Sequence, residues 1–449
     1  MTNTPNTSCN ADETYITAES IANDIYATPG DSVPSFYNSK KFEHNKMGEY
    51  LIEKMSICRI DGVLHIYDNG IYRHDESALQ KEMVLMIDNL PTTQRNEVCR
   101  YVAISPSIQE RQKSLPYLVP LNSCIYSIEK DCFYDYSSEH VFLTKFPYDY
   151  NPNAAPQSTV SDTIAAIANN DEDVIRLIYE TIGYCFYMKN TYRKAILLYG
   201  ETGRNGKSTL LNMIQQLLGQ QNYSNLSLQD FSEKFRPAQL FGKAANIGDD
   251  IPSTKIVDSS IFKKVVTGEN ITCERKGQDP FAFLPYAKCF FAMNTLPKPT
   301  DRSKAFFDRL IIIPLTHQFD ADCDVDLKDR QWTQAEMEYL MCMAIDGLKR
   351  LLANGRFTQP KSTIDILNAY QSASDPVSAF LTYYGSVEGK PTGEVYAAYL
   401  QWSNDSGIMY PMCQQVLSSH IITKTGLKSD SVRHHSNGGK PTRCFVRHN

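Results

Sequence analysis

The sequence predicts an α/β fold built on a parallel sheet, with a smaller α+β domain before it and a winged-helix-like module after it. An apolar run at 195–199 stops at a glycine-rich stretch, and a helical pattern follows at 207–218, which is the order strand, loop, helix. Further apolar runs at 289–293 and 310–313 would supply neighbouring strands of the same sheet. Helical stretches followed by a turn-linked strand pair end the chain, as in a winged helix.

Composition indicates a folded protein without a basic coat. Of the 449 residues, 42% are hydrophobic, which is ample for several cores. A formal net charge of -6 still allows a nucleic-acid partner in a local basic channel. The twelve cysteines never form C-x-x-C, so we expect neither a zinc site nor a disulfide framework. No stretch approaches the ~20 apolar residues of a membrane span and no signal peptide opens the chain, so we expect a cytoplasmic protein without a membrane partner.

Changes of pattern along the chain predict its domains. Residues 1–34 hold five acidic residues and no Lys or Arg, which is typical of a loosely ordered tail. Apolar runs on either side of Asn69-Gly70 predict a hairpin. We expect an acidic tail at 1–35, an α+β domain at 36–157, the central domain at 158–358, a linker at 359–377 and the winged-helix-like module at 378–449.

The glycine-rich stretch predicts a phosphate loop. Backbone N–H groups and the amino end of the following helix would hold phosphate oxygens, Lys207 would reach the β and γ phosphates of ATP, and Ser208 would ligate Mg²⁺. The strict pattern places a glycine where this chain has Glu201, so the loop is either one residue longer, from Gly200, or opened by Gly203. We expect nucleotide contacts from Gly203, Arg204, Asn205, Gly206, Lys207, Ser208 and Thr209.

A pair of carboxylates follows about 40 residues downstream of this loop, at Asp249 and Asp250. A phosphate loop needs a carboxylate on an adjacent strand to hold the metal ion and to orient the attacking water. Asp249 is the candidate for Mg²⁺ and Asp250 the candidate for the water. The alternative is a solvated turn before Pro252.

The region 261–315 resembles the successive motifs of superfamily 3 helicases, and more narrowly those of phage and plasmid primase-helicases related to the poxvirus type. The resemblance extends over about 400 residues, from 45 onward, and implies an AAA+-like core. The motifs that carry it lie, in order, at 262–269, 274–276, 281–285, 291–294 and 307–310.

The resemblance implies roles for three further residues. Asn294 matches the residue that positions the water near the γ phosphate; the alternative is a cap on the turn before Pro297. Arg309 matches the arginine finger that a neighbouring subunit supplies, with a structural salt bridge as the alternative. Lys263 aligns with a second cation contributed across the subunit interface, although Lys264 is adjacent and either could face solvent.

The resemblance also implies a DNA-binding hairpin around residues 274–276. Its basic tip, Arg275 and Lys276, would grip the phosphates of single-stranded DNA, with Lys276 as the stronger candidate. A solvated turn is the alternative. The basic stretch 411–449 would touch DNA as a winged helix, or else form a solvated hairpin.

Together these expectations describe an ATP-dependent DNA helicase for the replication of a phage, plasmid or other mobile element. The resemblance implies a ring of identical subunits, which we expect to be a hexamer, with single-stranded or forked DNA as its partner. Fewer than 45 residues precede the resembling region, so we expect priming from a separate polypeptide. Two alternatives stay open: an ATP-controlled replication initiator or loading protein, and an NTPase switch with a protein or RNA target.

Overall fold

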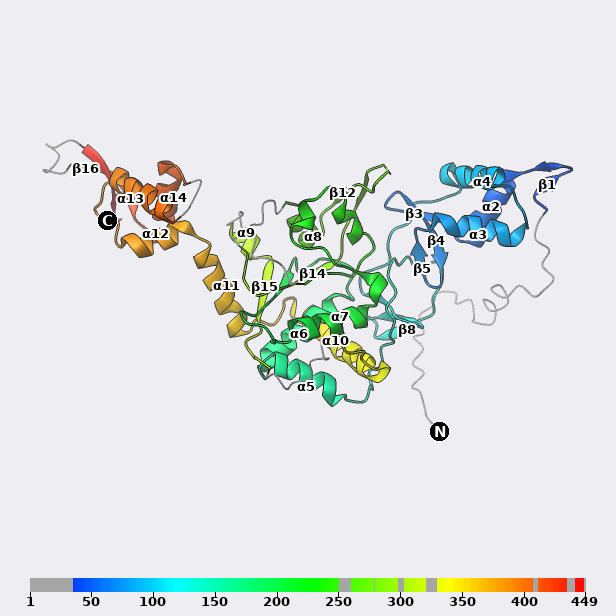
Figure 1. The fold of residues 1–449 in the computed structure, drawn as a ribbon, viewed down its shortest axis with the longest axis horizontal. Coiled ribbons are helices and arrows are strands. Elements are labelled where there is room, and N and C mark those ends of the chain that lie inside the picture. The colour runs from blue at the N-terminus through cyan, green and yellow to red at the C-terminus, as the bar shows by residue number, and fades with distance from the viewer. Residues whose placement is uncertain are drawn as a thin grey trace. The chain divides into compact units, whose positions relative to one another are not determined.

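The structure is a computed structural model that describes residues 35–249, 260–277, 279–297, 303–319, 329–406, 411–433 and 441–447 (Figure 1). The acidic tail, apart from Ser35, and Asp250 therefore lie outside the described residues. The chain forms two compact units. The first comprises Met1–Pro297 and Arg309–Lys361, and the second comprises Lys298–Asp308 and Ser362–Asn449.

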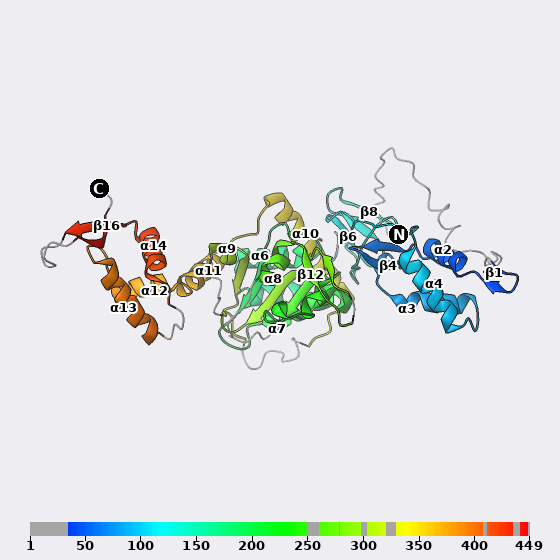
Figure 2. The same ribbon diagram turned by 90° about the horizontal axis from the view of Figure 1, so that it is seen from above.

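From residue 35 onward, where the structure describes it, the N-terminal part of the first unit contains three helices and several short antiparallel strands, and Figure 2 shows these helices beside β4. Asn69 and Gly70 join β4 to β5 and both have positive φ, which is the conformation that a tight two-residue hairpin needs, so the predicted hairpin is confirmed. The elements are β1 (Tyr37–Asn38), β2 (Lys41–Phe42), α2 (His44–Lys54), β3 (Cys58–Ile60), β4 (Val63–Asp68), β5 (Ile71–Arg73), α3 (Glu76–Met86), α4 (Thr92–Ile104), β6 (Leu118–Pro120), β7 (Ile125–Ser127) and β8 (Cys132–Tyr134).

A five-stranded parallel sheet forms the centre of the first unit, with strand order β10-β11-β14-β9-β15. The predicted α/β sheet is therefore confirmed. The strands are β9 (Ala195–Tyr199), β10 (Tyr223–Ser224), β11 (Ala245–Gly248), β14 (Lys288–Met293) and β15 (Leu310–Pro314). The helical elements around the sheet are α5 (Ser158–Ile167), α6 (Glu172–Tyr184), α7 (Lys207–Leu218), η1 (Gln220–Asn222), η2 (Asp230–Ser232), η3 (Arg236–Leu240), α8 (Ser260–Thr267) and α10 (Gln334–Asn354).

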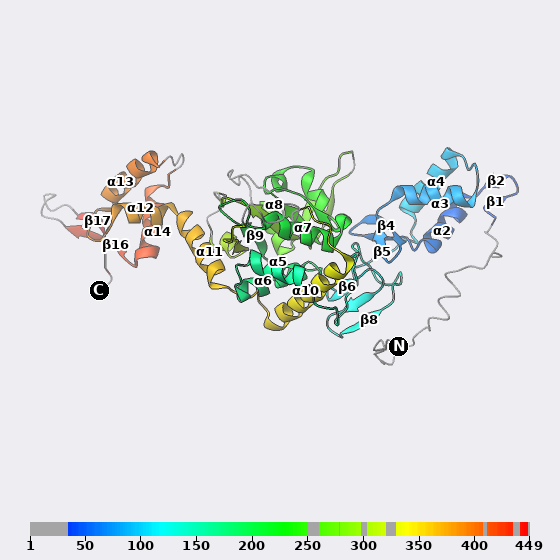
Figure 3. The same cartoon turned by 60° about the horizontal axis from the view of Figure 1, so that its bottom comes forward.

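Both faces of the sheet are covered, because successive side chains of a strand point to opposite faces. In β14, Phe290 belongs to the core formed with α5, α6, α7 and α10, which lie together in Figure 3. Its neighbour Phe291 contacts the rings of Phe231 and Phe262, from η2 and α8. Helices α6 and α10 approach closely: a Cβ on Gly183 would lie 2.0 Å from the carbonyl oxygen of Ala344, so only glycine fits there.

The second unit contains helices followed by a two-stranded antiparallel hairpin with its own core around Phe380, Tyr399 and Phe445. Residues 359–377, expected to be a linker, hold the helix α11. Helix α12 begins at Pro376, where the Asp375 side chain caps it. The elements are α9 (Lys304–Phe307), α11 (Lys361–Ala373), α12 (Pro376–Tyr384), α13 (Thr392–Asp405), α14 (Gln414–Thr425), β16 (Lys428–Arg433) and β17 (Pro441–Val446).

Candidate nucleotide site and hairpin

The glycine-rich loop connects the central strand β9 to helix α7, which begins at Lys207. Its fold is set by backbone conformations that few residues adopt: Arg204 and Gly206 both have positive φ. Gly206 also packs tightly, since a Cβ there would lie 2.5 Å from Cγ1 of Ile167. The loop therefore curls at the amino end of α7, where backbone N–H groups are free of helical partners.

Lys207 is half-buried, and oxygens of the loop surround its ammonium group. Nζ donates to the Asn205 side-chain oxygen at 2.6 Å and to the backbone oxygens of Gly200 at 3.1 Å and Thr202 at 3.4 Å. Asn205 is 2% exposed, so its side chain is a fixed part of the loop. Ser208 is exposed and Thr209 is buried beside them.

The packing distinguishes the two glycines that the sequence left as alternatives. A Cβ on Gly200 would lie 2.4 Å from the Asn205 side-chain nitrogen, whereas a Cβ on Gly203 would meet nothing within 4 Å. Gly200 N also donates to the Met293 backbone oxygen at 3.2 Å, which ties the loop to β14. These contacts favour the loop that begins at Gly200 and is one residue longer than the strict pattern.

Two polar side chains lie at the same edge of the sheet as this loop. Asp249 follows β11 and Asn294 follows β14, and both are exposed. All three strands are parallel, with β14 between β9 and β11, so their carboxyl ends meet. The structure thus brings Lys207, Asp249 and Asn294 to one edge.

Arg309 lies at the opposite edge. Its backbone oxygen accepts a hydrogen bond of 2.7 Å from Ala195 N, at the amino end of β9. The loop begins after five residues of strand, a separation of roughly 17 Å at ~3.3 Å per residue. The Arg309 backbone is therefore far from the glycine-rich loop of its own chain. Lys263 lies in α8 and is half-buried, whereas Lys264 is exposed.

The region around residues 274–276 connects two antiparallel strands, β12 (Ile271–Cys273) and β13 (Phe281–Phe283). Lys276 is exposed near the tip. Arg275 instead packs over two aromatic rings, 4.6 Å from the centre of Phe281 and 5.6 Å from that of Phe241. Burial lowers the pKa of Arg275. The two basic residues thus differ: Lys276 faces solvent, and Arg275 fastens the hairpin to its support.

Phe241 forms that support and was not identified from the sequence. Its ring lies 5.2 Å from Phe283 in the hairpin and 5.7 Å from His65 in β4. Asn190 and Lys288, buried beneath the hairpin, were also missed. A lysine directly before the apolar run 289–293 was the available signal, because an ammonium rarely begins a buried strand.

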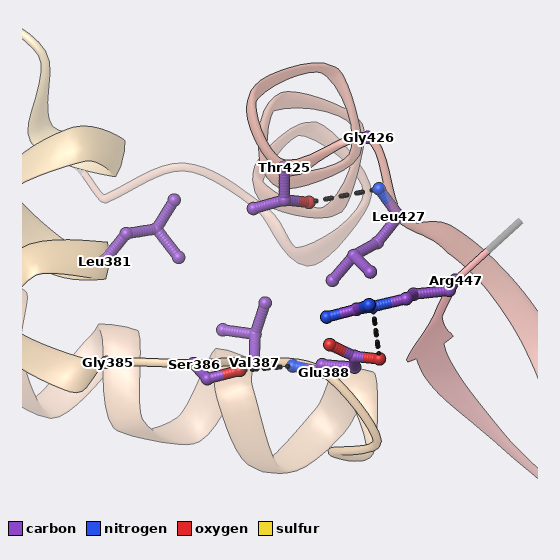
Figure 4. A pocket seen from close by; sticks show the side chains of 9 residues that line it. All are labelled: Leu381, Gly385, Ser386, Val387, Glu388, Thr425, Gly426, Leu427 and Arg447. Carbon is purple, nitrogen blue, oxygen red and sulfur yellow. Dashed lines mark hydrogen bonds and ion pairs between the residues drawn. The ribbon is translucent and has the colours of Figure 1, made fainter.

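The second unit carries basic side chains on its hairpin, where Lys428, Arg433 and Arg443 are exposed. A hollow of about 500 Å³ lies where the loops after α12 and α14 meet the end of β17 (Figure 4). Arg447 points into it and forms an ion pair of 2.8 Å with Glu388. This contact fastens the hairpin to the helices.

Among the residues that the structure describes, no group of three or more His, Cys, Asp or Glu side chains is arranged to hold a metal ion. No helix in the described part of the chain has the length and apolarity of a membrane span.

Two family models and one viral relative match parts of this chain. Residues 36–168 match the family described as D5 N terminal like, and residues 198–309 match a family of unknown function, DUF5906. Putative helicase 121R of Invertebrate iridescent virus 3 is 22% identical over 277 residues, which is 52% of this chain and 29% of the viral protein. The chain thus matches less than a third of that relative's length.

Two solved apo structures of the NrS-1 C-terminal region share the fold. One has a TM-score of 0.53 at 12% identity and covers 90% of this chain and 98% of that one. The other has a TM-score of 0.50 at 13% identity and covers 90% and 99%. These two likenesses, at 12% and 13% identity, concern the fold and agree with the mixed α/β core.

Proposed function

We propose that the protein is an ATP-dependent DNA helicase with a superfamily 3, AAA+-like core. It would act in the replication of a phage, plasmid or other mobile element. One observation carries the proposal: the carboxyl ends of β9, β14 and β11 bring Lys207, Asn294 and Asp249 to one edge of a parallel sheet. The D5-type amino-terminal match and the helicase-named viral relative support the assignment to replication.

The residues at this edge fit ATP and Mg²⁺. The loop already holds an ammonium group, Lys207 Nζ, among three oxygens, at the amino end of a twelve-residue helix. Lys207 and the loop amides would hold the β and γ phosphates, and Ser208 and Asp249 would ligate Mg²⁺. The metal ion would supply neutralisation of phosphate charge.

The remaining proposed catalytic residues would orient the attacking water or stabilise the charge of the transition state. The amide of Asn294 would orient the attacking water, together with Asp250. Arg309 would stabilise the transition-state charge in the site of a neighbouring subunit. Its position at the far edge of its own sheet supports this arrangement, which requires an oligomer and which we propose to be a hexameric ring. Lys263 would be a second cation contributed by the neighbouring subunit.

DNA contacts would come from two places. Lys276 would track the backbone of single-stranded DNA in the ring channel, supported by its exposure on the β12–β13 hairpin. The second unit, which we propose to be a winged-helix module, would recruit forked DNA through its exposed basic hairpin. A separate primase would supply primers.

ATPase activity measured with and without single-stranded DNA, alongside mass in solution, tests the proposal. We expect DNA-stimulated hydrolysis by a ring, and its loss in Lys207→Ala, with a cooperative thermal transition showing that this variant remains folded. Unstimulated ATPase combined with tight binding to one duplex sequence would instead identify an initiator. Hydrolysis at the wild-type rate in Lys207→Ala would refute the site.

A further inference from the structure

The β12–β13 hairpin is joined to the core by two short segments, one from α8 and one into β14. The side chain of Asn190, in the loop after α6, contacts both. Its Nδ2 donates to the backbone oxygen of Val265 at 2.7 Å and lies 3.4 Å from that of Pro285. Gly268 packs on the same side chain, since a Cβ there would lie 3.1 Å from Cβ of Asn190. One buried amide thus holds both of the segments that join the hairpin to the core, which we call the roots of the hairpin.

Lys288 completes this arrangement. Its Nζ donates to Asn190 Oδ1 at 2.8 Å and to the backbone oxygens of Tyr286 at 2.6 Å and Lys189 at 3.3 Å. The ammonium also lies 4.3 Å from the centre of the Tyr184 ring. Lys288 is 1% exposed, and burial of an ammonium is unfavourable unless its donors are used. Here three oxygens from the α6 loop and the hairpin root accept from it.

The position of the pair separates it from the nucleotide site. Lys288 is the first residue of β14, and Asn294 follows the last residue of that strand. Six residues of strand, or roughly 20 Å, lie between the two ends. A change at Lys288 should therefore alter the hairpin without touching the phosphate loop.

We propose that Asn190 and Lys288 are positioning residues that fix the roots of the β12–β13 hairpin and thereby hold Lys276 in place against single-stranded DNA, an inference that rests on the proposed function. An apolar side chain of equal length at 288 would fill the same space. It would not tie the α6 loop to the hairpin, because that link consists of donated hydrogen bonds.

Two substitutions test this role. Lys288→Met keeps the length of the side chain and removes its donors. Asn190→Asp keeps the size of the side chain and the acceptor for Lys288 but removes the donors to Val265 and Pro285. The matched control is Lys243→Met, because Lys243 is half-buried in the same unit and donates to the backbone oxygen of Gln221.

Three measurements are made on each variant: backbone hydrogen exchange in 271–273 and 281–283, basal ATPase, and the concentration of single-stranded DNA that gives half-maximal stimulation. We expect both variants to exchange about tenfold faster or more and to need about tenfold more DNA. Basal kcat and the KM for ATP should stay within about twofold, and the control should match wild type. Asn190→Asp alone carries the test if Lys288→Met does not fold.

Lys276→Ala, measured in parallel, distinguishes the two possible failures. If Lys276→Ala loses stimulation while both root variants keep wild-type exchange and DNA response, the positioning role is overturned and the proposed function stands. If Lys276→Ala still responds fully to DNA, the hairpin is not the DNA contact, and the inference falls with that part of the proposed function.

Discussion

The two glycines of the proposed phosphate loop, Gly200 and Gly203, should respond differently to the same substitution. In Gly200→Ala the new Cβ would lie 2.4 Å from the Asn205 side-chain nitrogen, which real Cβ contacts do not reach, so Asn205 must move. Asn205 also accepts a 2.6 Å hydrogen bond from Lys207. Displacing it removes a bond to a charged group, which contributes about 1.5–3 kcal/mol. Gly203→Ala meets nothing within 4 Å and has no backbone strain.

The expected result follows from these contacts. At about 1.4 kcal/mol per tenfold, Gly200→Ala should weaken nucleotide binding about 10- to 150-fold, while Gly203→Ala should stay within about threefold. Titration with a fluorescent ATP analogue measures both, and thermal unfolding of each variant shows whether the fold is intact. Equal effects, or a larger loss in Gly203→Ala, would refute the loop that begins at Gly200.

Three further predictions concern DNA, the subunit interface and pH. Lys276→Ala should keep basal ATPase, lose stimulation by single-stranded DNA and show a shallower salt dependence of DNA binding. Arg275→Ala should instead lower the melting temperature, because the Arg275 guanidinium packs on aromatic rings. The reverse pattern would contradict the exposed position of Lys276 and the packed position of Arg275. Arg309→Ala should bind ATP normally and hydrolyse it ~10³- to 10⁵-fold more slowly. Mixing this variant with Lys207→Ala should restore part of the rate. If rings that are shown to exchange subunits do not recover activity, a site shared between subunits is excluded. Burial lowers the pKa of Lys288 to about 7, so this side chain binds one more proton in the unfolded chain than in the folded chain at a pH between this value and its ordinary pKa. Burial raises the pKa of the neighbouring thiols Cys185 and Cys289, which act in the opposite direction at higher pH, so stability should rise by at most about 1.4 kcal/mol per unit only between about pH 7 and about pH 8.5. In denaturant titrations Lys288→Met should lose this slope, and an unchanged slope would show that another group causes it.

Some of the fold followed from short stretches of sequence. The strand, loop and helix around Lys207 and the hairpin at Asn69-Gly70 depend on residues that are neighbours in the chain. Turn conformations and hydrophobic periodicity act over these distances, so both could be predicted. The helix α11 was not predicted, although Ile364, Leu367 and Tyr370 recur in it every three residues, because the segment was assigned to a linker between two domains.

The site itself divides in the same way. The sequence alone determined which residue types are available for the proposed phosphate, metal and DNA contacts, because their chemistry and spacing are local. Only the tertiary structure placed β14 between β9 and β11, buried Arg275 against Phe241, and assembled the surroundings of Lys288. Sheet order depends on how helices far apart in the chain cover both faces. The oxygens around Lys288 come from segments about a hundred residues apart, as between Lys189 and Tyr286, and packing against each other, not sequence proximity, brings them together.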